Sequence, residues 1–383
     1  MGEKMKKIII VLIVLSMSFI KVNGQSLDLA PNATASILIE ANSKQILNAK
    51  NETEKLFPAS TTKIMTMILL FEAIHSGQIS FEDQITTSSY ASSMGGSQVY
   101  LEENETMSLH EMFKCMAIGS ANDATVAIGE CIAGTNDAFV KMMNDKAKEL
   151  KLVNTQFKNA TGLHDPEHYS CAYDLAMMAA YLIEIGGDEL LEVTSTYDTY
   201  IRENTDQKFW LVNTNKLLNA YTGLDGLKTG YTKEAGYCLV TTAKKDDLRI
   251  IGVVMQESDP KSRNKEMCQM LDYGFNLYEN KVVYKKGDLV TQIDVYNSEI
   301  KTTGVYAKED ISYLVKKGED QGPSYKIRIL KNTAPFVSGE IIGQLDVMNG
   351  ESVVFSSDLI VNENIAALTF VQKTVINIQR MFQ

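Results

Sequence analysis

The sequence is poor in the residues on which two common kinds of site depend. It has four histidines and five cysteines among 383 residues, with no C-x-x-C pair and no G-x-S-x-G motif. A disulfide framework is therefore not favoured, and we expect the cysteines to be small core residues, with at least one thiol free because their number is odd. A Ser-His-Asp hydrolase is also a weak interpretation, because its usual serine motif is absent.

Basic residues are also in deficit. The chain has 37 lysines and arginines against 48 aspartates and glutamates, a net charge of −11. This balance argues against nucleic acid or another polyanion as a partner. Internal repeats and low-complexity tracts are absent, and 45% hydrophobic with 22% charged residues is an ordinary globular composition. The length is sufficient for two or three domains.

A basic and then apolar start predicts export. Lys4, Lys6 and Lys7 precede the 13-residue run "IIIVLIVLSMSFI", and Gly24 follows it. This pattern is typical of a secretory signal, here residues 1–24, whereas the run is short for the alternative of an uncleaved membrane anchor. Cleavage after Gly24 would remove four lysines and Glu3, and so lower the net charge by three, to −14.

The remaining pattern predicts an α+β protein in three parts. Residues 34–49 favour a hairpin, the pattern from Ser60 to about residue 195 is helical, and strand character returns at 223–255. We therefore expect one antiparallel sheet with an inserted helical cluster over residues 25–277. Short alternating strands predict a small β-sandwich at 284–358. Residues 361–383 favour an amphipathic helical tail, which could lie on a membrane surface or pack on the β-domain.

The stretch "LFPASTTKIMTMILLFEAI" places a serine and a lysine at the start of an apolar helix. S-x-x-K occurs five times here, and only Ser60 opens a long apolar run. One helical turn brings Lys63 beside the Ser60 hydroxyl. A serine becomes a good nucleophile when a neighbouring base takes its proton, and burial can lower a lysine pKa enough for that role. The alternative is an ordinary helix cap with a solvated lysine.

Two further short motifs follow in the chain. Ser120 and Asn122 form S-x-N after an expected helix end, and 228–230 is the single K-T-G, on the first late strand. Each is weak alone: the first could be a helix cap, and the second a strand end with a bulge at Gly230. Gly230 would also let a substrate backbone approach, and Lys228 would add a second cation that lowers the pKa of Lys63.

Together S-x-x-K, S-x-N and K-T-G are the signature of penicillin-binding proteins and serine β-lactamases. The segments "PASTTKIMT", "GGSQVYLE", "GSANDA", "NATGLHDPEHYSCAYDLA", "NTNKLL" and "DGLKTGYTKEAGYCLV" closely resemble the low-molecular-mass D-alanyl-D-alanine carboxypeptidases of peptidase family S11. The resemblance is strong over about residues 27–275 and extends to the later domain in layout. It implies a β-lactamase/transpeptidase-like fold, with no cofactor and no metal.

The resemblance also implies roles for individual residues. Ser60 looks like the acylated nucleophile and Lys63 like its base, while Ser120 and Asn122 would relay a proton and hold the substrate amide. The terminal carboxylate would be bound by residues of the K-T-G strand, and the oxyanion by two backbone N–H groups. The carboxylate set is Lys228 and Thr229, with Thr232 as a helper; the N–H groups are those of Ser60 and Tyr231. Some members have an arginine where this chain has Thr214, so carboxylate binding would lean more on Lys228 and the threonines.

The resemblance implies a substrate of peptidoglycan stem peptides that end in D-Ala-D-Ala, a location at the outer face of the cytoplasmic membrane, and inhibition by β-lactams. A β-lactamase would share the three motifs, but E-x-x-L-N is absent between Ser120 and Lys228, so penicillin should acylate and leave slowly. A non-catalytic penicillin-binding sensor or scaffold is a further alternative. His164, Asp165 and His168 invite a metal interpretation, which a loop without a third distant ligand disfavours.

Overall fold

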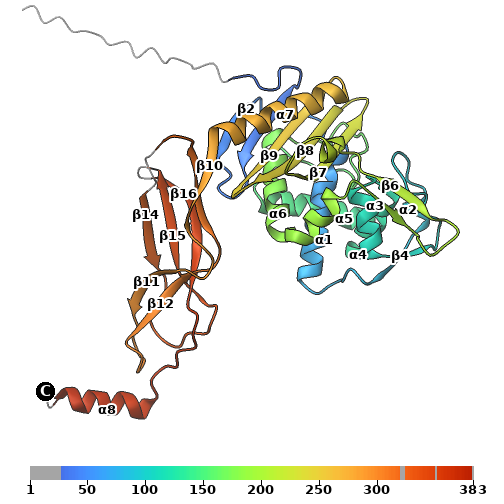
Figure 1. The fold of residues 1–383 in the computed structure, drawn as a ribbon. Coiled ribbons are helices and arrows are strands. Elements are labelled where there is room, and N and C mark those ends of the chain that lie inside the picture. The colour runs from blue at the N-terminus through green and yellow to red at the C-terminus, as the bar shows by residue number, and fades with distance from the viewer. Residues whose placement is uncertain (1–26, 320–323, 350–351, 382–383) are drawn as a thin grey trace, which may run out of the picture.

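The structure is a computed structural model that describes residues 27–319, 324–349 and 352–381 (Figure 1). The expected signal segment, 1–24, lies outside the described residues. The described chain forms a large domain of sheet and helices, and then a β-domain that extends to one side of it (Figure 1). The α+β organisation with an inserted helical cluster and a following all-β domain is confirmed.

A five-stranded antiparallel sheet is the centre of the large domain. Its strand order is β2-β1-β9-β8-β7. The strands are β1 (Ala35–Glu40), β2 (Ile46–Lys50), β7 (Leu224–Thr232), β8 (Gly236–Lys245) and β9 (Leu248–Glu257). β1 and β2 are the hairpin that the sequence predicts, and the other three lie where late strand character is expected. The sheet thus joins the beginning of the domain to its end, with the helical residues inserted between.

Helices cover both faces of this sheet. Because side chains alternate along a strand, Ile37 and Ile39 enter the core shared with α1 (Lys63–His75) and α6 (Ala172–Ser195). Leu38 points the other way, into a second core under α7 (Pro260–Leu277). Burying each such side chain contributes about 1.5–3 kcal/mol, so a sheet filled on both faces is a firm base for β7 and its K-T-G motif.

The inserted cluster carries the other site residues. Its helices besides α1 and α6 are η1 (Ala59–Thr62), α2 (Ser89–Ser92), α3 (Leu109–Ala117), α4 (Asn122–Ala133) and α5 (Asn136–Glu149). Ser108 and Glu111 have the spacing of a capping box in the sequence, and the Ser108 hydroxyl accepts the Glu111 N–H at 3.2 Å, which caps α3. The glycine pair 186–187 favours a helix end in the sequence, but Gly187 makes only a kink in α6, at φ 51°, and helix resumes beyond it.

The structure contains several elements that the sequence did not predict. They are α7, the 3-10 turn η2 (Lys216–Asn219), and the two-stranded sheets of β3 (Gln84–Thr86) with β4 (Thr106–Ser108) and of β5 (Asp198–Ile201) with β6 (Phe209–Val212). The strands of these two small sheets have only three or four residues, too few to display an alternating pattern. α7 was missed because its apolar residues are dispersed among charged ones, although Asp259 caps it and Pro260 opens it.

The β-domain has a five-stranded sheet in the order β11-β12-β16-β15-β14 and a two-stranded sheet of β10 and β13. The strands are β10 (Tyr278–Tyr284), β11 (Leu289–Asp294), β12 (Thr302–Ala307), β13 (Ile311–Lys316), β14 (Ser324–Ile329), β15 (Ile341–Asn349) and β16 (Ser352–Ile360). Ile311 of the small sheet shares a core with Leu345 and Leu359 of the large one. The two sheets therefore pack face to face over one apolar interior.

A helix, α8 (Phe370–Met381), follows the β-domain and lies at its far end from the large domain (Figure 1). The side chains of Phe370, Val371 and Val375 are 84%, 70% and 49% exposed. Among the described residues, no helix combines the length and apolar character needed to cross a membrane.

All five cysteines are free thiols. Cys115, Cys171 and Cys238 are buried, as expected for small core residues. Cys131 is exposed and Cys268 half-buried, so the core interpretation is wrong for Cys131.

Candidate active site

Ser60 and Lys63 meet where η1 runs into α1. Ser60 is half-buried in the 3-10 turn. Lys63 is the first residue of α1, and its side chain has no exposed surface. The Lys63 Nζ lies 3.0 Å from the Ser60 Oγ. Local helical geometry thus places an amine beside a hydroxyl that remains reachable from solvent.

The amine of Lys63 has two further partners. Its Nζ donates to the Asn122 Oδ1 at 2.7 Å and to the Thr161 carbonyl oxygen at 2.8 Å. Both oxygens are acceptors only, so a neutral amine satisfies them with its two N–H bonds. Its lone pair is then left for the third contact, the Ser60 hydroxyl. The neutral form therefore fits this site with every group paired.

The electrostatic environment favours that neutral form. Burial lowers the pKa of Lys63 well below its ordinary value, and the Lys228 cation lowers it further, while the Asp123 carboxylate opposes both effects. Burial also lowers the pKa of Lys228, to about 7, with the Arg263 cation as a second cause. Burial of Lys63 and the Lys228 cation thus act in the same direction, since both favour a neutral amine beside Ser60.

The S-x-N motif lies between α3 and α4. Ser120 is 4% exposed and has a positive φ of 61°. Asn122 begins α4 and links two segments, because its Oδ1 accepts from Lys63 and its Nδ2 donates to the Gly95 carbonyl oxygen at 2.7 Å. Each atom of this amide has a partner that fixes which end faces the lysine.

Asp123 is a residue of this site that the sequence analysis did not select. It follows Asn122 directly and is completely buried. Its carboxylate accepts the N–H groups of Val99 and Leu101 at 3.1 Å and 3.0 Å. The acid thus fixes the segment after Gly95 to the start of α4. Its partners lie more than twenty residues away, and no local pattern announces them.

The K-T-G motif runs along β7 beside the Ser60 turn. Lys228 and Thr229 are 1% and 7% exposed. The Thr229 hydroxyl donates to the Thr214 Oγ1 at 2.7 Å, so the position where some family members have an arginine contacts the motif here through a hydroxyl. Tyr231 is 56% exposed, and its ring lies 4.3 Å from that of Tyr237.

Thr232 ends β7. Its Oγ1 accepts the Ala235 N–H at 3.0 Å, which closes the turn into β8. The hydroxyl therefore has a structural partner in this state.

Two glycines let the turn around Ser60 fit between its neighbours. A Cβ on Gly230 would lie 2.9 Å from the Pro58 carbonyl oxygen and 3.0 Å from the Ser60 nitrogen. A Cβ on Gly162, whose φ is 83°, would lie 1.8 Å from the Ala59 carbonyl oxygen. The alternative of a bulge at Gly230 is not what the structure has, because that residue pairs regularly with Cys238. The close approach that Gly230 permits is to the turn of the nucleophile itself.

The "HDPEH" segment packs against the site as a structural loop. His168 is 2% exposed; its Nε2 lies 2.8 Å from the Thr62 Oγ1, and its Nδ1 accepts the Lys158 N–H at 3.2 Å. His164 packs edge-on against Phe57 instead. Both ring nitrogens of His168 are thus engaged by the protein, and no group of three possible metal ligands occurs in the described residues.

One site therefore brings together a serine, an amine with a lowered pKa, an amide and a lysine-bearing strand, on an α+β fold. This defines the class of penicillin-recognising serine enzymes. Family comparison makes the assignment specific. Residues 22–259 match the model of the D-alanyl-D-alanine carboxypeptidase family, and residues 278–367 match that of the penicillin-binding protein 5 C-terminal domain. The chain belongs to the D-alanyl-D-alanine carboxypeptidase family, S11, of low-molecular-mass penicillin-binding proteins.

Individual relatives cover both domains. The chain is 45% identical over 364 residues to the D-alanyl-D-alanine carboxypeptidase DacF of Bacillus subtilis (strain 168). This match covers 94% of this chain and 93% of the relative. Penicillin-binding protein 5 of Haemophilus influenzae is similar in structure, with a TM-score of 0.70 and 30% identity over 88% of this chain and 98% of that one. Penicillin-binding protein D2 of Listeria monocytogenes, solved in its ampicillin-bound form, has a TM-score of 0.57 and 31% identity over 64% and 98%.

Proposed function

We propose that the protein is a serine-type D-alanyl-D-alanine carboxypeptidase that removes the terminal D-alanine of peptidoglycan stem pentapeptides. The observation that carries this proposal is the Lys63 amine, buried and with a lowered pKa, at 3.0 Å from the Ser60 hydroxyl. Membership of the carboxypeptidase family supports the substrate, and the ampicillin complex of a relative supports acylation by β-lactams.

In the first half of the reaction, Ser60 forms an ester with the substrate. Lys63 takes the proton of the Ser60 hydroxyl while its oxygen attacks the carbonyl carbon of the penultimate D-Ala. The bond from that carbon to the terminal nitrogen then breaks, and the departing amine receives the proton, relayed through Ser120. The N–H of Ser60, whose nitrogen lies close to Gly230 of β7, and that of Tyr231 would stabilise the oxyanion.

In the second half, water hydrolyses the ester, its proton returns to the Ser60 oxygen, and the shortened peptide leaves with a new carboxylate. We assign substrate binding to the side chains around the peptide bond that is broken. Asn122 would hold the substrate amide, and Lys228 with Thr229 would hold the terminal carboxylate, with Thr232 as a helper. A charged Lys228 beside a neutral Lys63 is the combination that this chemistry needs.

The activity is tested with a pentapeptide that ends in D-Ala-D-Ala. Incubation with the mature protein should shorten the peptide by one alanine, as measured by mass spectrometry, and prior treatment with benzylpenicillin should prevent it. A peptide of unchanged mass would contradict the proposal. Absence of E-x-x-L-N also predicts that the benzylpenicillin adduct is released slowly, which sets the protein apart from a β-lactamase.

The pH dependence of acylation should change when Lys228 is replaced by alanine. Loss of its cation removes one of the two causes that lower the pKa of Lys63, so that pKa rises, and the acid limb of the acylation profile moves to higher pH. Loss of one charge-assisted contact to the ligand carboxylate should slow acylation by about 10- to 100-fold. The rate constant is measured with a fluorescent penicillin between about pH 5 and about pH 10.

Lys244→Ala is the matched control, because it removes an exposed lysine at the far end of the same sheet. An Lys228→Ala profile with the same acid limb as the wild type would remove Lys228 from the causes of the Lys63 shift.

We also propose that the protein is exported and held at the outer face of the cytoplasmic membrane. The signal-like residues 1–24 support export. The exposure of Phe370, Val371 and Val375 on α8 supports an apolar helix face that could enter a lipid surface. Lys373 adds a basic group on the described part of this helix. The β-domain would then raise the catalytic domain above the membrane toward peptidoglycan.

Liposome flotation tests the role of the tail. The mature protein should float with vesicles of anionic and zwitterionic lipid, and a variant without residues 361–383 should stay in the soluble fraction. Salt should weaken this binding only modestly, because apolar burial carries it. If both forms remain soluble, the tail is a packing helix and not an anchor.

A further inference from the structure

The loop of residues 95–105 is hydrogen-bonded to the start of α4, where the S-x-N motif ends. The backbone N–H of Asn122 donates to the Ser97 carbonyl oxygen, and its Nδ2 donates to that of Gly95, both at 2.7 Å. Asp123 accepts the N–H groups of Val99 and Leu101. Four hydrogen bonds therefore connect this loop to two adjacent residues of the site.

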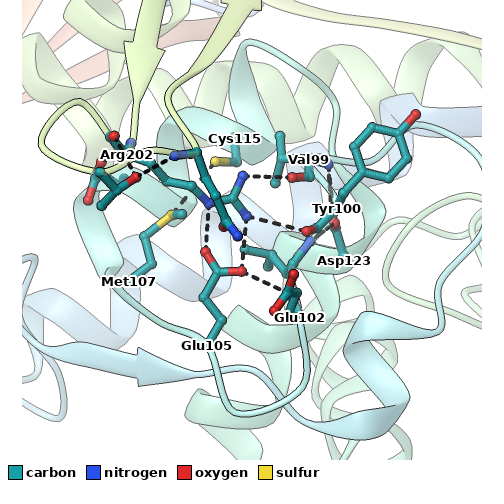
Figure 2. A network of polar contacts seen from close by, with 12 residues as sticks. Val99, Tyr100, Glu102, Glu105, Met107, Cys115, Asp123 and Arg202 are labelled. Atoms are coloured by element: carbon teal, nitrogen blue, oxygen red, sulfur yellow. Dashed lines mark hydrogen bonds and ion pairs between the residues drawn. The ribbon is translucent and has the colours of Figure 1, made fainter.

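Arg202, which directly follows β5, also binds this loop (Figure 2). Its Nε and Nη2 donate to the two carboxylate oxygens of Glu105 at 2.6 Å and 3.0 Å. Its Nη1 donates to the Val99 carbonyl oxygen at 2.9 Å. Val99 is thus bound on both sides, its N–H by Asp123 and its C=O by Arg202. The loop is fixed between the start of α4 and the β5–β6 pair.

The side chain and the backbone of Arg202 are both held in place by buried or half-buried contacts. Its side chain is 8% exposed and that of Glu105 is 18% exposed, so solvent cannot substitute freely for a lost partner. Its backbone is fixed as well, because its N–H donates to the Glu111 Oε1 at 3.1 Å. One planar guanidinium makes a two-bond contact with a carboxylate and also reaches a carbonyl oxygen, and an ammonium cannot reproduce this fork geometry.

The loop in turn sets the orientation of the Asn122 amide. An amide can rotate to exchange its oxygen and nitrogen, and the acceptor at Gly95 selects the state in which the nitrogen faces the loop. The oxygen then faces Lys63 and accepts one of its N–H bonds. A displaced loop would release this amide, and Lys63 would lose a contact that aims its lone pair at Ser60.

We propose that Arg202 is a positioning residue for acylation of Ser60. It acts through Val99 and Glu105 on the 95–105 loop, and through that loop on Asn122 and Lys63. The proposal rests on the proposed function and assigns a role in it to a side chain 97 residues from its partner Glu105. It places the effect on the acylation step, since Arg202 itself reaches no reacting atom.

Stopped-flow acylation of the mature protein by a fluorescent penicillin tests this role. Measured over a range of penicillin concentrations, it separates non-covalent binding from the acylation rate constant. Arg202→Gln should lower that rate constant by about tenfold or more, because small misplacements of catalytic groups are costly. Arg202→Lys keeps the charge and should still acylate several-fold more slowly than the wild type. Arg249→Gln is the control, since it breaks another half-buried pair, with Asp225, at the far end of the sheet.

Rates are compared per folded molecule, from the fraction that shows native circular dichroism at the assay temperature. Equal rate constants for the wild type and Arg202→Lys, or for the wild type and folded Arg202→Gln, would overturn the proposal and leave Arg202 a stabilising residue only. If Arg202→Gln does not fold, Arg202→Lys alone decides. A wild-type protein that is not acylated would instead contradict the proposed function.

Discussion

Ser60→Ala should eliminate the covalent penicillin adduct. Intact-mass spectrometry of the wild type with benzylpenicillin should show one added molecule, because the Ser60 hydroxyl is the group that the Lys63 amine contacts at 3.0 Å. Alanine removes the attacking oxygen and leaves the surrounding turn, with its close approach to Gly230, unchanged. The expected loss is therefore complete and not a matter of degree.

The sequence offers a matched control for this substitution. Ser258 also belongs to an S-x-x-K motif, with Lys261, and it is exposed before α7. Ser258→Ala should form the adduct as the wild type does. An adduct of full intensity on Ser60→Ala, or its loss from Ser258→Ala, would show that the nucleophile has been misassigned.

Lys63→Met should lower the acylation rate constant by about a thousandfold, the middle of the range for loss of a general base. Methionine fills much of the same buried volume and cannot accept a proton. The Asn122 and Thr161 oxygens also lose their donor. The rate constant is followed with a fluorescent penicillin, and prolonged incubation should still give a small amount of adduct, since Ser60 remains.

Lys261→Met, the same change in the exposed S-x-x-K pair, should acylate at the wild-type rate. If Lys63→Met retained more than about a tenth of the wild-type rate constant, general-base catalysis by Lys63 would be excluded, because a general base contributes about a hundredfold at least.

The parts of the site that follow local rules could be predicted from the sequence. The contact of Ser60 with Lys63 needs only one helical turn, and the strand that carries Lys228 is visible in its own residues. Antiparallel pairing of β1 with β9 then joins the first hairpin and the late strands into one sheet, as the order of the patterns predicted.

The parts that depend on distant partners could not. Asp123 and Arg202 act on loop backbone far away in sequence, and their side chains carry no periodic signal. From the sequence, Gly230 was expected only to let a substrate backbone approach. The structure shows that it also lets the turn at Ser60 approach β7, a contact between residues far apart in the chain. The strands of the β3–β4 and β5–β6 pairs are too short to be recognised in the sequence, although β5 leads directly into Arg202.

Release of D-alanine from a D-Ala-D-Ala pentapeptide, measured against the amount of protein, is the most direct test of the central claim. We predict many molecules of free D-alanine per molecule of mature protein, none above background from Ser60→Ala, and unchanged release from Ser258→Ala. A wild-type protein that forms the penicillin adduct but releases no D-alanine would be a penicillin-binding sensor or scaffold, and the proposed carboxypeptidase activity would be wrong.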